Sequence, residues 1–415
     1  MKRMIFLCSE TFPPVYQSIK YIFNEYLSRQ WQIFWIMPAE EGLLNKAEMQ
    51  KWGNNSCWFI PKVRAKSIIN LVYEYLRYAR MIKNKMETIL KYTGGAELII
   101  VRDDPFMAWR AYSVCKKRNI PFVYQLSHFK EEEIIYYAKK GIYKNKISNL
   151  VKGYLGRIFR NYLLKKADLI LAISRQMKLT LVQDNKIEEK KIEVLPEGVE
   201  VGLWENQGTT SESELLKSQL KLSSKRVLLY IGTLSRAREL DFIIRVLKRL
   251  KKEIDNIHLI IIGGGLNDND EKYLKRVADD MGLGPAVTFM GRLPYSEVLK
   301  YMEIAEVGLS PFPDNPIFRN NSPIKTMEYI MAGIPVVASD LPEHRLLLKQ
   351  GGGLCVKHDE KSYAEAITTL LNNPELRARL VNEGKYYLKK ERGFKVLSDK
   401  IGKIFENMIY RNKMK

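Results

Sequence analysis

Cysteine and histidine are scarce in this chain of 415 residues. The four cysteines stand far apart and in no paired spacing: Cys8, Cys57, Cys115 and Cys355. This pattern argues against a disulfide framework and a thiolate zinc site, and it is typical of a reducing compartment. The four histidines also lack the spacing of metal ligands. We therefore expect no metal centre.

Long apolar runs are missing as well. No run approaches the roughly 18 residues that a membrane-spanning helix needs. The apolar stretch near the start covers only Met4 to Cys8, which is too short for the hydrophobic region of a signal peptide. A buried first strand explains it better. The sequence predicts a cytoplasmic protein without a membrane span.

Positive charge is abundant and unevenly placed. The chain has 68 Lys and Arg against 47 Asp and Glu, a net charge of +21. Residues 1–200 hold 34 basic against 20 acidic side chains, a net of +14, and the remainder carries +7. Such a field favours an anionic partner, namely nucleic acid, acidic lipid or a phosphorylated substrate.

Short apolar runs alternate with segments of helical period. The runs cover residues 4–8, 33–37, 98–101, 122–126, 169–173, 192–195, 227–231, 258–262, 286–290, 307–310 and 334–338. Many are unbroken, as in strands that are buried on both faces. The length suits two domains. The sequence thus predicts an α/β protein with two tandem, Rossmann-like, doubly wound parallel-sheet domains.

A polar segment rich in Ser and Thr at residues 202–225 marks the expected linker. We accordingly place the first domain at residues 1–201 and the second at residues 226–392. Residues 393–415 form an amphipathic helix with no strand after it, and we expect it to pack back on the first domain.

Residues 138–166 form an unusual basic stretch. They carry nine Lys and Arg and no acidic residue, interleaved with aromatic and aliphatic side chains. Such helices suit an anionic membrane surface. The candidate membrane-binding residues are Lys144, Lys146, Lys152, Arg157 and Arg160. The alternative is a solvated helix whose lysine stems cover the sheet while their ammonium groups stay in water.

The strongest local motif is NNSPIKTMEYIMAGIPVVAS at residues 320–339. Ser322 suits a helix N-cap and Pro323 the first helical position. The free amides near Ile324 and Lys325 would then form an anion site. The helix dipole disfavours a lysine at this end, and a bound phosphate would offset that conflict.

Glu328 points with the apolar face of the same helix and needs a polar partner there. Sugar hydroxyls could donate hydrogen bonds to it. The alternative is a salt bridge with Lys325, because charged pairs at this spacing are common on helices.

Three other loops follow predicted strands. YIGTLSRARELD places Arg236 and Arg238 at the carboxyl edge of a sheet, where guanidinium groups suit a diphosphate, although exposed arginines are ordinary. Residues 263–265 are glycines without the G-x-G-x-x-G spacing, so a tight turn is expected. His128 follows a strand in the first half, placed either for a site or as a structural histidine.

Taken together, these segments resemble the retaining glycosyltransferases of family 4. YIGTLSRARELD, HLIIIGGG, VTFMGRLPYSEVLKYMEIAEVGLSPF and SPIKTMEYIMAGIPVVAS stand in the order of that family. SETFPP, KKADLILAISRQM and KIEVLPEGVE are similar to segments of its first half. The resemblance implies a GT-B architecture, in which two Rossmann-like domains face each other across a cleft.

The resemblance also implies site residues. Arg238 would hold the donor diphosphate, Glu328 the nucleotide ribose, and His128 would lie near the donor sugar; these are the expected catalytic residues. Asn320 stands where the family often has a first glutamate, and Thr233 where an arginine is frequent. The expected donor-binding set is Thr233, Arg236, Arg238, Met290, Gly291, Asn320, Ser322, Pro323, Ile324, Lys325 and Glu328.

The implied activity is transfer of a sugar, with retention, from a nucleotide sugar to a glycan or a polyprenyl-diphosphate-linked acceptor in bacterial surface polysaccharide synthesis. We expect a peripheral enzyme on the inner face of the cell membrane, without nucleic-acid partner, cofactor or metal, because fixed cations can replace the metal. A nucleotide-sugar epimerase of the same architecture and a non-enzymatic polyanion-binding protein are the alternatives. The donor sugar, the base, the acceptor and the oligomeric state stay open.

Overall fold

The computed structural model describes residues 1–62, 68–143, 145–204, 210–265 and 268–414. The chain divides into two compact units. Unit 1 comprises Met1–Glu197, Asn320–Ser322 and Phe394–Lys415, and unit 2 comprises Gly198–Arg319 and Pro323–Gly393. The boundary thus falls at Glu197, before the linker that the sequence predicts.

Unit 1 is built on an eight-stranded sheet of order β3-β4-β2-β1-β5-β6-β7-β8. The strands are β1 Lys2–Cys8, β2 Trp31–Ala39, β3 Met49–Trp52, β4 Asn55–Pro61, β5 Leu98–Arg102, β6 Phe122–Leu126, β7 Leu169–Ala172 and β8 Ile192–Val194. Seven run parallel. β3 pairs antiparallel with β4 through a turn at Gly53, where φ is +60°. The predicted parallel sheet is thus confirmed, with one antiparallel strand added at this edge, because a two-residue turn can join only antiparallel neighbours.

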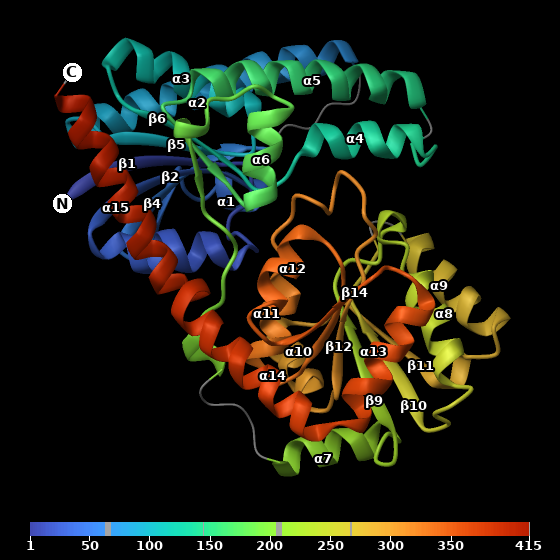
Figure 1. Ribbon diagram of the computed structural model, residues 1–415. Helices are drawn as coiled ribbons and strands as arrows, with labels where there is room; N and C mark the ends of the chain where they lie inside the picture. The colour runs from blue at the N-terminus through green and yellow to red at the C-terminus, as the bar shows by residue number, and fades with distance from the viewer. Residues whose placement is uncertain (63–67, 144, 205–209, 266–267, 415) are drawn as a thin grey trace. The chain divides into compact units, whose positions relative to one another are not determined.

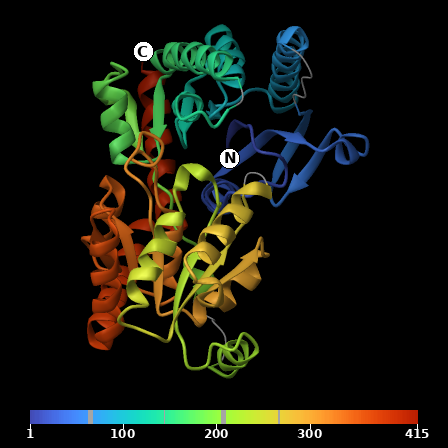
Figure 2. The same cartoon turned by 90° about the vertical axis from the view of Figure 1, so that its right-hand side faces the viewer.

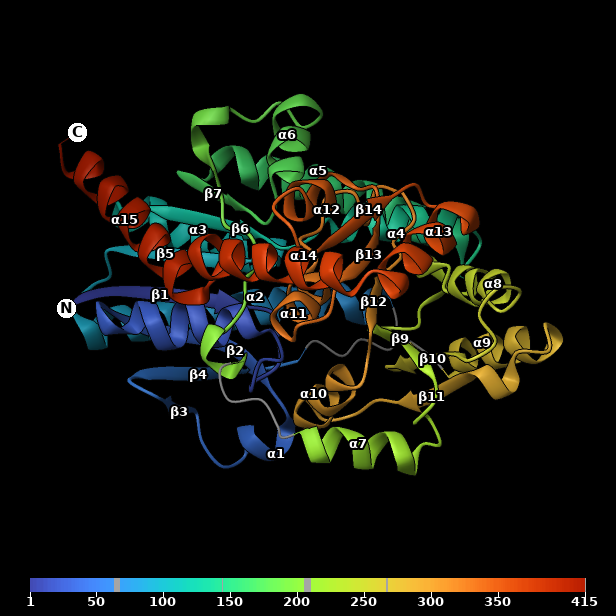
Figure 3. The ribbon, with the colours of Figure 1, turned by 60° about the horizontal axis from the view of Figure 1, so that its bottom comes forward.

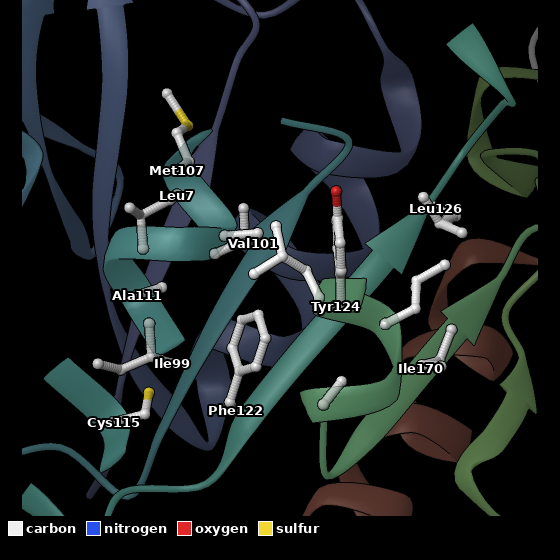
Figure 4. Close-up of a cluster of buried hydrophobic side chains, with 14 of the residues drawn as sticks. Leu7, Ile99, Val101, Met107, Ala111, Cys115, Phe122, Tyr124, Leu126 and Ile170 are labelled. Carbon is white, nitrogen blue, oxygen red and sulfur yellow. The ribbon is translucent and has the colours of Figure 1, made fainter. Parts of the chain in front are cut away.

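Helices cover both faces of this sheet. They are α1 Glu41–Leu44, α2 Ile68–Thr93, α3 Pro105–Arg118, α4 Lys130–Lys139, α5 Lys146–Lys166, α6 Arg175–Gln183 and α15 Phe394–Lys413, with a π-helix, η1, at Ile19–Tyr26. Buried side chains of α2, α3, α5 and α6 pack on one face. Those of η1 and α15 pack on the other. Figure 4 shows part of the first core, where Ile99 lies near Ala111 and Cys115 of α3, and Phe122 and Tyr124 follow on β6.

The amphipathic patterns explain this arrangement. In α15 the buried residues Phe394, Leu397, Ile401 and Phe405 recur with helical period and face the sheet. Helix α3 begins where the carboxylate of Asp104 accepts hydrogen bonds from two backbone amides at 2.8 Å. Helices α4 and α5 pack against each other, as Figure 1 shows.

Unit 2 contains a six-stranded sheet of order β11-β10-β9-β12-β13-β14, in which all neighbours are parallel. The strands are β9 Arg226–Ile231, β10 Ile257–Ile262, β11 Val287–Gly291, β12 Val307–Ser310, β13 Val336–Ser339 and β14 Gly353–Val356. The order reverses between β9 and β12. Open α/β sheets bind ligands outside the carboxyl ends of the strands at such a reversal.

The helices of unit 2 are α7 Thr210–Gln219, α8 Asp241–Leu250, α9 Asp268–Asp280, α10 Tyr295–Glu303, α11 Ile324–Met331, α12 Pro342–Leu348, α13 Glu360–Asn372 and α14 Pro374–Tyr387. Helices α8, α9 and α13 contribute to the core on one face of the sheet, and α8 and α9 lie side by side in Figure 2. Helices α10 and α11 contribute to the core on the other face.

Helix α7 corrects the predicted linker. Thr210–Gln219 is helical and belongs to unit 2. It contacts α10, which lies beside it in Figure 3, and the Ser213 hydroxyl donates a 2.9 Å hydrogen bond to Glu303. Leu216 and Leu220 are four residues apart and both pack against the core of unit 2. This spacing of apolar residues in an otherwise polar segment favours a helix.

Candidate donor site

The carboxyl edge of the unit 2 sheet is shaped by two close-packed glycines. Gly232 follows β9 with φ of +146°, and Gly263 follows β10 with φ of +141°. A Cβ on Gly263 would lie 1.9 Å from the carbonyl oxygen of Gly232. A Cβ on Gly232 would lie 2.8 Å from the Lys325 Nζ. The Gly263 position therefore serves the packing of two loops, in agreement with the predicted turn.

The loop after β9 sends its two arginines in different directions. Arg236 and Arg238 occupy a 3-10 turn, η5 Arg236–Arg238. The Arg236 Cζ lies 3.5 Å from the ring centroid of Tyr273, and its Nε lies 3.9 Å from the Asp270 carboxylate, both on α9. The Arg238 Cζ lies 5.0 Å from the ring centroid of Phe312. Arg238 is thus the arginine that turns toward the start of α11.

Lys325 lies in the first turn of α11 and approaches the same place. Its Nζ is buried and has no hydrogen-bond partner among the described residues, Glu328 included. The Nζ lies 4.1 Å from the ring centroid of Tyr230 and 4.9 Å from that of Phe312. The expected alternative of a hydrogen-bonded Lys325–Glu328 pair is therefore not what the structure contains.

The electrostatics of this pair are unusual. Burial, and then the neighbouring Arg238 guanidinium, hold the pKa of the Lys325 ammonium well below its ordinary value of 10.5, against the opposing effect of Glu328. The Nη1 of Arg238 is also buried without a hydrogen-bond partner in the described part of the chain. Two adjacent cationic groups, each with a buried donor atom that has no partner among the described residues, are chemically suited to an anion, which would supply both the missing charge and the missing acceptors.

Glu328 lies one turn further along α11. The Tyr295 hydroxyl, at the start of α10, donates a 3.0 Å hydrogen bond to its Oε1. The next residue, Tyr329, is fully buried, and its hydroxyl accepts a 2.8 Å hydrogen bond from the Ile231 amide at the end of β9. This bond ties α11 to β9, so Lys325 and Glu328 are carried on a helix that is fixed to the strand end.

The remaining predicted donor residues of unit 2 lie at the same edge. Thr233 follows β9, and its carbonyl oxygen accepts a 3.1 Å hydrogen bond from the Tyr230 hydroxyl. Met290 and Gly291 end β11, two strands away. Pro323 and Ile324 precede Lys325 at the start of α11. Because β9 and β11 are parallel to β10 on either side, their carboxyl ends meet at one edge of the sheet.

Ser322 and Asn320 have a different environment. The N-cap of α11 is Pro323, without a side-chain cap, so the predicted Ser322 cap is wrong. The Ser322 hydroxyl instead accepts a 3.2 Å hydrogen bond from the Glu197 amide. Asn320 is buried; its side-chain oxygen accepts from the Thr180 hydroxyl at 2.9 Å and its carbonyl from the Ser174 hydroxyl at 2.7 Å. Both residues belong to unit 1.

His128 also belongs to unit 1, directly after β6. Its Nδ1 lies 3.2 Å from the Ser127 hydroxyl, which hydrogen-bonds to the Asp103 carboxylate after β5. The histidine is therefore at the carboxyl edge of its own sheet, where the sequence predicts it. Its role near a donor sugar stays a prediction.

The basic residues predicted to bind a membrane differ in their exposure. Lys146 and Lys152 are exposed on α5 and Arg157 is half-buried, whereas Lys144 lies outside the described residues. Arg160 is buried, and its guanidinium donates hydrogen bonds to Glu131 at 2.7 Å and Glu132 at 2.6 Å. Its assignment to a membrane surface is therefore wrong, because the acidic partners on α4 hold it inside.

The described residues lack two features. No helix there combines the length and apolarity that crossing a membrane requires. No cluster of three or more His, Cys, Asp or Glu side chains in that part of the chain is arranged around a common point for a metal ion.

The aromatic lining of the site was not among the predicted features. Phe312, Phe318 and Tyr230 lie against the two cations, and Tyr295 binds Glu328. Phe312 and Phe318 come from the loop after β12, whose sequence PFPDNPIFRN contains no charge pattern that points to a site. The available signal was its position, since it follows β12, the strand beyond the reversal.

Both halves of the chain match models of known protein families. Residues 18–203 match the family model described as Glycosyltransferase Family 4, and residues 211–386 match the model described as Glycosyl transferases group 1. The alpha-monoglucosyldiacylglycerol synthase of Streptococcus pneumoniae is 23% identical over 283 residues, which cover 67% of this chain and 60% of that protein. The chain thus spans about three fifths of the length of this relative.

Solved structures share the fold over nearly the whole chain. Sucrose-phosphate synthase from Thermosynechococcus elongatus superposes with a TM-score of 0.76 at 14% identity, covering 99% of this chain and all of that one. HepE of Anabaena, solved in complex with UDP, gives a TM-score of 0.70 at 16% identity, covering 98% of this chain and 100% of its own. With both halves matched in order and the fold shared end to end, the chain belongs to the family 4 glycosyltransferases of GT-B architecture.

Proposed function

We propose that this chain transfers a sugar from a nucleotide sugar to an acceptor hydroxyl. The observation that supports it is the pair of cations Arg238 and Lys325 at the carboxyl edge of a parallel sheet, whose Nη1 and Nζ atoms are buried. When the bond between the sugar and the diphosphate breaks, negative charge develops on the leaving diphosphate. Cations that are already in place stabilise that charge without reorganisation.

Retention of anomeric configuration is part of the proposal. The acceptor would attack from the face that the diphosphate leaves, and the leaving phosphate oxygen would take the proton of the acceptor hydroxyl. We assign no side chain as the base for this step. Glu328 would accept hydrogen bonds from the ribose hydroxyls, with Tyr295 fixing its carboxylate. His128 would contact the donor sugar.

The acceptor is proposed to be a glycan or a polyprenyl-diphosphate-linked sugar in bacterial surface polysaccharide synthesis. A relative whose name includes glucosyldiacylglycerol is consistent with acceptors at a lipid surface. UDP is the first probe for the donor, because HepE was solved with UDP.

The donor assignment is tested by calorimetric titration of the purified chain with UDP, GDP and ADP. We expect Arg238→Ala to weaken binding of the preferred diphosphate about tenfold or more, since a hydrogen bond to a charged group contributes about 1.5–3 kcal/mol. Arg236→Ala, from the same turn, is the matched control and should change the affinity less. Equal affinities for the parent and the Arg238→Ala variant would contradict the proposal.

Glu328→Ala tests the ribose contact by turnover. The variant should fold normally and lose most of its transfer activity with a nucleotide-sugar donor. A Tyr295→Phe variant keeps the carboxylate but removes its hydrogen bond, and should lose less. Near-normal turnover of Glu328→Ala would remove this residue from the site.

We further propose that unit 1 attaches to the inner face of the cell membrane through α5. Ile147, Val151, Leu155 and Ile158 recur at helical spacing and are 78%, 52%, 62% and 65% exposed. An apolar ridge of this kind beside basic side chains is typical of helices that lie in a membrane interface. The basic neighbours include Lys146 and Lys152, so the expected lipid is anionic.

The ridge is held outward by the opposite side of the helix. Arg160 is bound to Glu131 and Glu132 of α4, and Gly153 lets α5 approach α4 so closely that a Cβ there would lie 2.5 Å from Ile135. The face that carries Ile147 and Ile158 is therefore fixed away from α4. Attachment would combine insertion of apolar side chains with attraction between charges.

Vesicle co-sedimentation separates the two contributions. Changing Leu155 and Ile158 to Ser should weaken binding to vesicles with anionic lipid at both low and high salt. Changing Lys146 and Lys152 to Gln should weaken it mainly at low salt, because salt screens charges. Changing Lys361 and Lys357 of unit 2 to Gln is the control. Parent-like binding by both α5 variants would contradict the proposal.

A further inference from the structure

One aromatic ring lies against both cations of the donor site. Phe312 follows β12 and is 7% exposed. Its ring centroid is 5.0 Å from the Arg238 Cζ and 4.9 Å from the Lys325 Nζ. Two like charges thus share one ring. The Tyr230 ring lies 4.1 Å from the Lys325 Nζ, with its hydroxyl near Arg238, and the Phe318 ring lies 5.4 Å from the Arg238 Cζ.

The orientation of this ring is fixed by stacking. The Phe318 ring stacks on Phe312 at 4.9 Å with an interplanar angle of 23°. The His344 ring stacks at 5.7 Å with an angle of 13°. His344 is itself held, because its Nε2 lies 3.0 Å from the Ser310 hydroxyl and its Nδ1 lies 2.8 Å from the carbonyl oxygen of Ser339. The stack leaves the Phe312 ring little freedom to turn.

The histidine beneath the ring adds no third charge near neutral pH. Burial lowers the pKa of His344 to about 4, and its ring is hydrogen-bonded on both nitrogens. The stacked partners of Phe312 are therefore neutral. The π-electron density of the ring remains available to the two cations that lie against it.

A cation near an aromatic face is attracted by the negative potential of the ring, and the attraction grows when water is excluded. No ion pair of Arg238 or Lys325 occurs within the described ranges of the chain, so the rings supply the compensation that carboxylates supply elsewhere. Unlike a carboxylate, a ring does not occupy the hydrogen-bond donors of the cation. The donors stay available to a diphosphate.

From this geometry we propose that Phe312 is a positioning residue, whose ring holds Arg238 and Lys325 together in the arrangement that binds the donor diphosphate. The proposal rests on the proposed function, since it presupposes a diphosphate at these cations. It assigns Phe312 no contact with the substrate. The ring acts on the affinity only through the two cations.

The test uses the full-length chain and calorimetric titration with UDP and with uridine. Phe312→Leu should weaken UDP binding about tenfold and leave uridine binding unchanged, because only the diphosphate contacts the two cations. Phe312→Trp keeps an aromatic face and should retain most of the UDP affinity. Phe318→Leu, which removes a ring near Arg238 alone, is the matched control and should have a smaller effect.

Fluorinated phenylalanines at position 312 give a second test if Phe312→Leu does not fold. Successive fluorines weaken the negative face of the ring at nearly constant shape. UDP affinity should therefore fall stepwise from phenylalanine through the monofluoro and difluoro rings to the trifluoro ring. A ring that served packing alone would leave the affinity flat along this series, which would overturn the proposal.

The outcomes also separate this inference from the proposed function. If Arg238→Ala weakens UDP binding and Phe312→Leu does not, Phe312 has no positioning role and the donor site stands. If Phe312→Leu weakens UDP and uridine equally, the ring is structural and the proposal is wrong. If neither Arg238→Ala nor Lys325→Met weakens UDP, the donor site itself is wrong.

Discussion

Buried arginines in unit 1 and buried cations in unit 2 are compensated by different groups. In unit 1 the Arg160 guanidinium is 1% exposed, contacts two carboxylates at 2.7 and 2.6 Å, and lies 4.7 Å from the Phe129 ring. In unit 2, Arg238 and Lys325 contact rings but form no ion pair within the residues that the structure describes. Aromatic rings are common to both places. Among the described residues, carboxylates in ion-pair contact with the cation occur only at the first, although Glu328 acts on Lys325 from a greater distance.

The difference shows what each cation is available for. A guanidinium whose hydrogens are donated to carboxylates joins two helices and has little capacity left for a ligand. A cation on a ring is stabilised but keeps its donors, so it can bind an incoming anion. The first arrangement is expected to stabilise the fold, and the second to reduce stability in return for binding.

The largest effect that this comparison predicts is on the stability of unit 1. Arg160→Ala should lower its free energy of unfolding by about 3–5 kcal/mol, because the change leaves two partly buried carboxylates without a counter-ion. Urea unfolding followed by tryptophan fluorescence measures it, since five of the six tryptophans belong to unit 1. Adding Glu131→Gln and Glu132→Gln should restore much of the loss. A loss below about 1 kcal/mol would mean that the ion pair is dispensable.

Lys325→Met should have the opposite effect on stability and a large one on binding. UDP affinity should fall about tenfold or more with the loss of a charge-assisted hydrogen bond. The free energy of unfolding should rise by about 1 kcal/mol or more, since an uncompensated buried charge is removed. Calorimetry of the parent and the variant measures both quantities. A destabilised Met variant would show that the ammonium group supports the fold.

The pH dependence of stability checks the same residue. The pKa of Lys325 is lower in the folded chain than its ordinary value of 10.5, so the unfolded chain holds this proton more tightly. The contribution of Lys325 to stability therefore rises as pH rises toward 10.5. The Lys325→Met variant should lack this contribution, and identical pH profiles of the two proteins would contradict the shift.

The sequence was informative about strands and about charged site residues. Buried parallel strands are continuous apolar runs, so β6 and β12 were located to the residue. The hairpin strands β3 and β4 and the edge strand β14 were missed. No residue of β3 and one of the four residues of β14 is fully buried, and β4 begins with the polar residues Asn55 and Ser56. The exposed strand β3 and the short strand β14 lack the long apolar run that identifies a strand such as β6.

The misses in the site have a common cause. Ser322 and Arg160 were assigned from local pattern, whereas their partners, Glu197 and Glu131, are distant in sequence or on another helix. Phe312 was missed because an aromatic residue in a loop has the same local signature whether it packs a core or faces cations. Such pairings are set by tertiary contacts, which one-dimensional spacing does not encode.

The titration of Glu10 tests how the charge of Arg102, another buried arginine of unit 1, is compensated. Arg102 is buried, with Asp103, Glu10 and Glu197 at 3.5, 3.9 and 3.8 Å. Burial raises the pKa of Glu10 to about 7 despite the opposing effect of Arg102. The folded chain thus binds this proton more tightly than the unfolded chain, whose value is near 4.5.

The stability of unit 1 should therefore decrease as pH rises from about 4.5 to about 7. The loss is about 1–2 kcal/mol, allowing for the part of the Glu10 side chain that water reaches. Glu10→Gln should remove this decrease, and urea unfolding across that pH range measures it. If the Glu10→Gln variant kept the pH profile of the parent, a group other than Glu10 would be responsible for the decrease. All three carboxylates near Arg102 would then be charged in the folded chain.

The smallest expected effect on activity is that of a chelator. It tests whether Arg238 and Lys325 of unit 2 are available to neutralise the diphosphate. If Arg238 and Lys325 are free to neutralise the leaving diphosphate, turnover with a nucleotide-sugar donor should stay the same in excess EDTA. The Lys325→Met variant is tested in the same assay. If the ammonium group itself neutralises the diphosphate, added magnesium or manganese should not restore the activity of this variant. Activity that disappears with EDTA and returns with manganese would show that a metal ion carries the charge. The cations on the Phe312 ring would then be auxiliary to that metal ion.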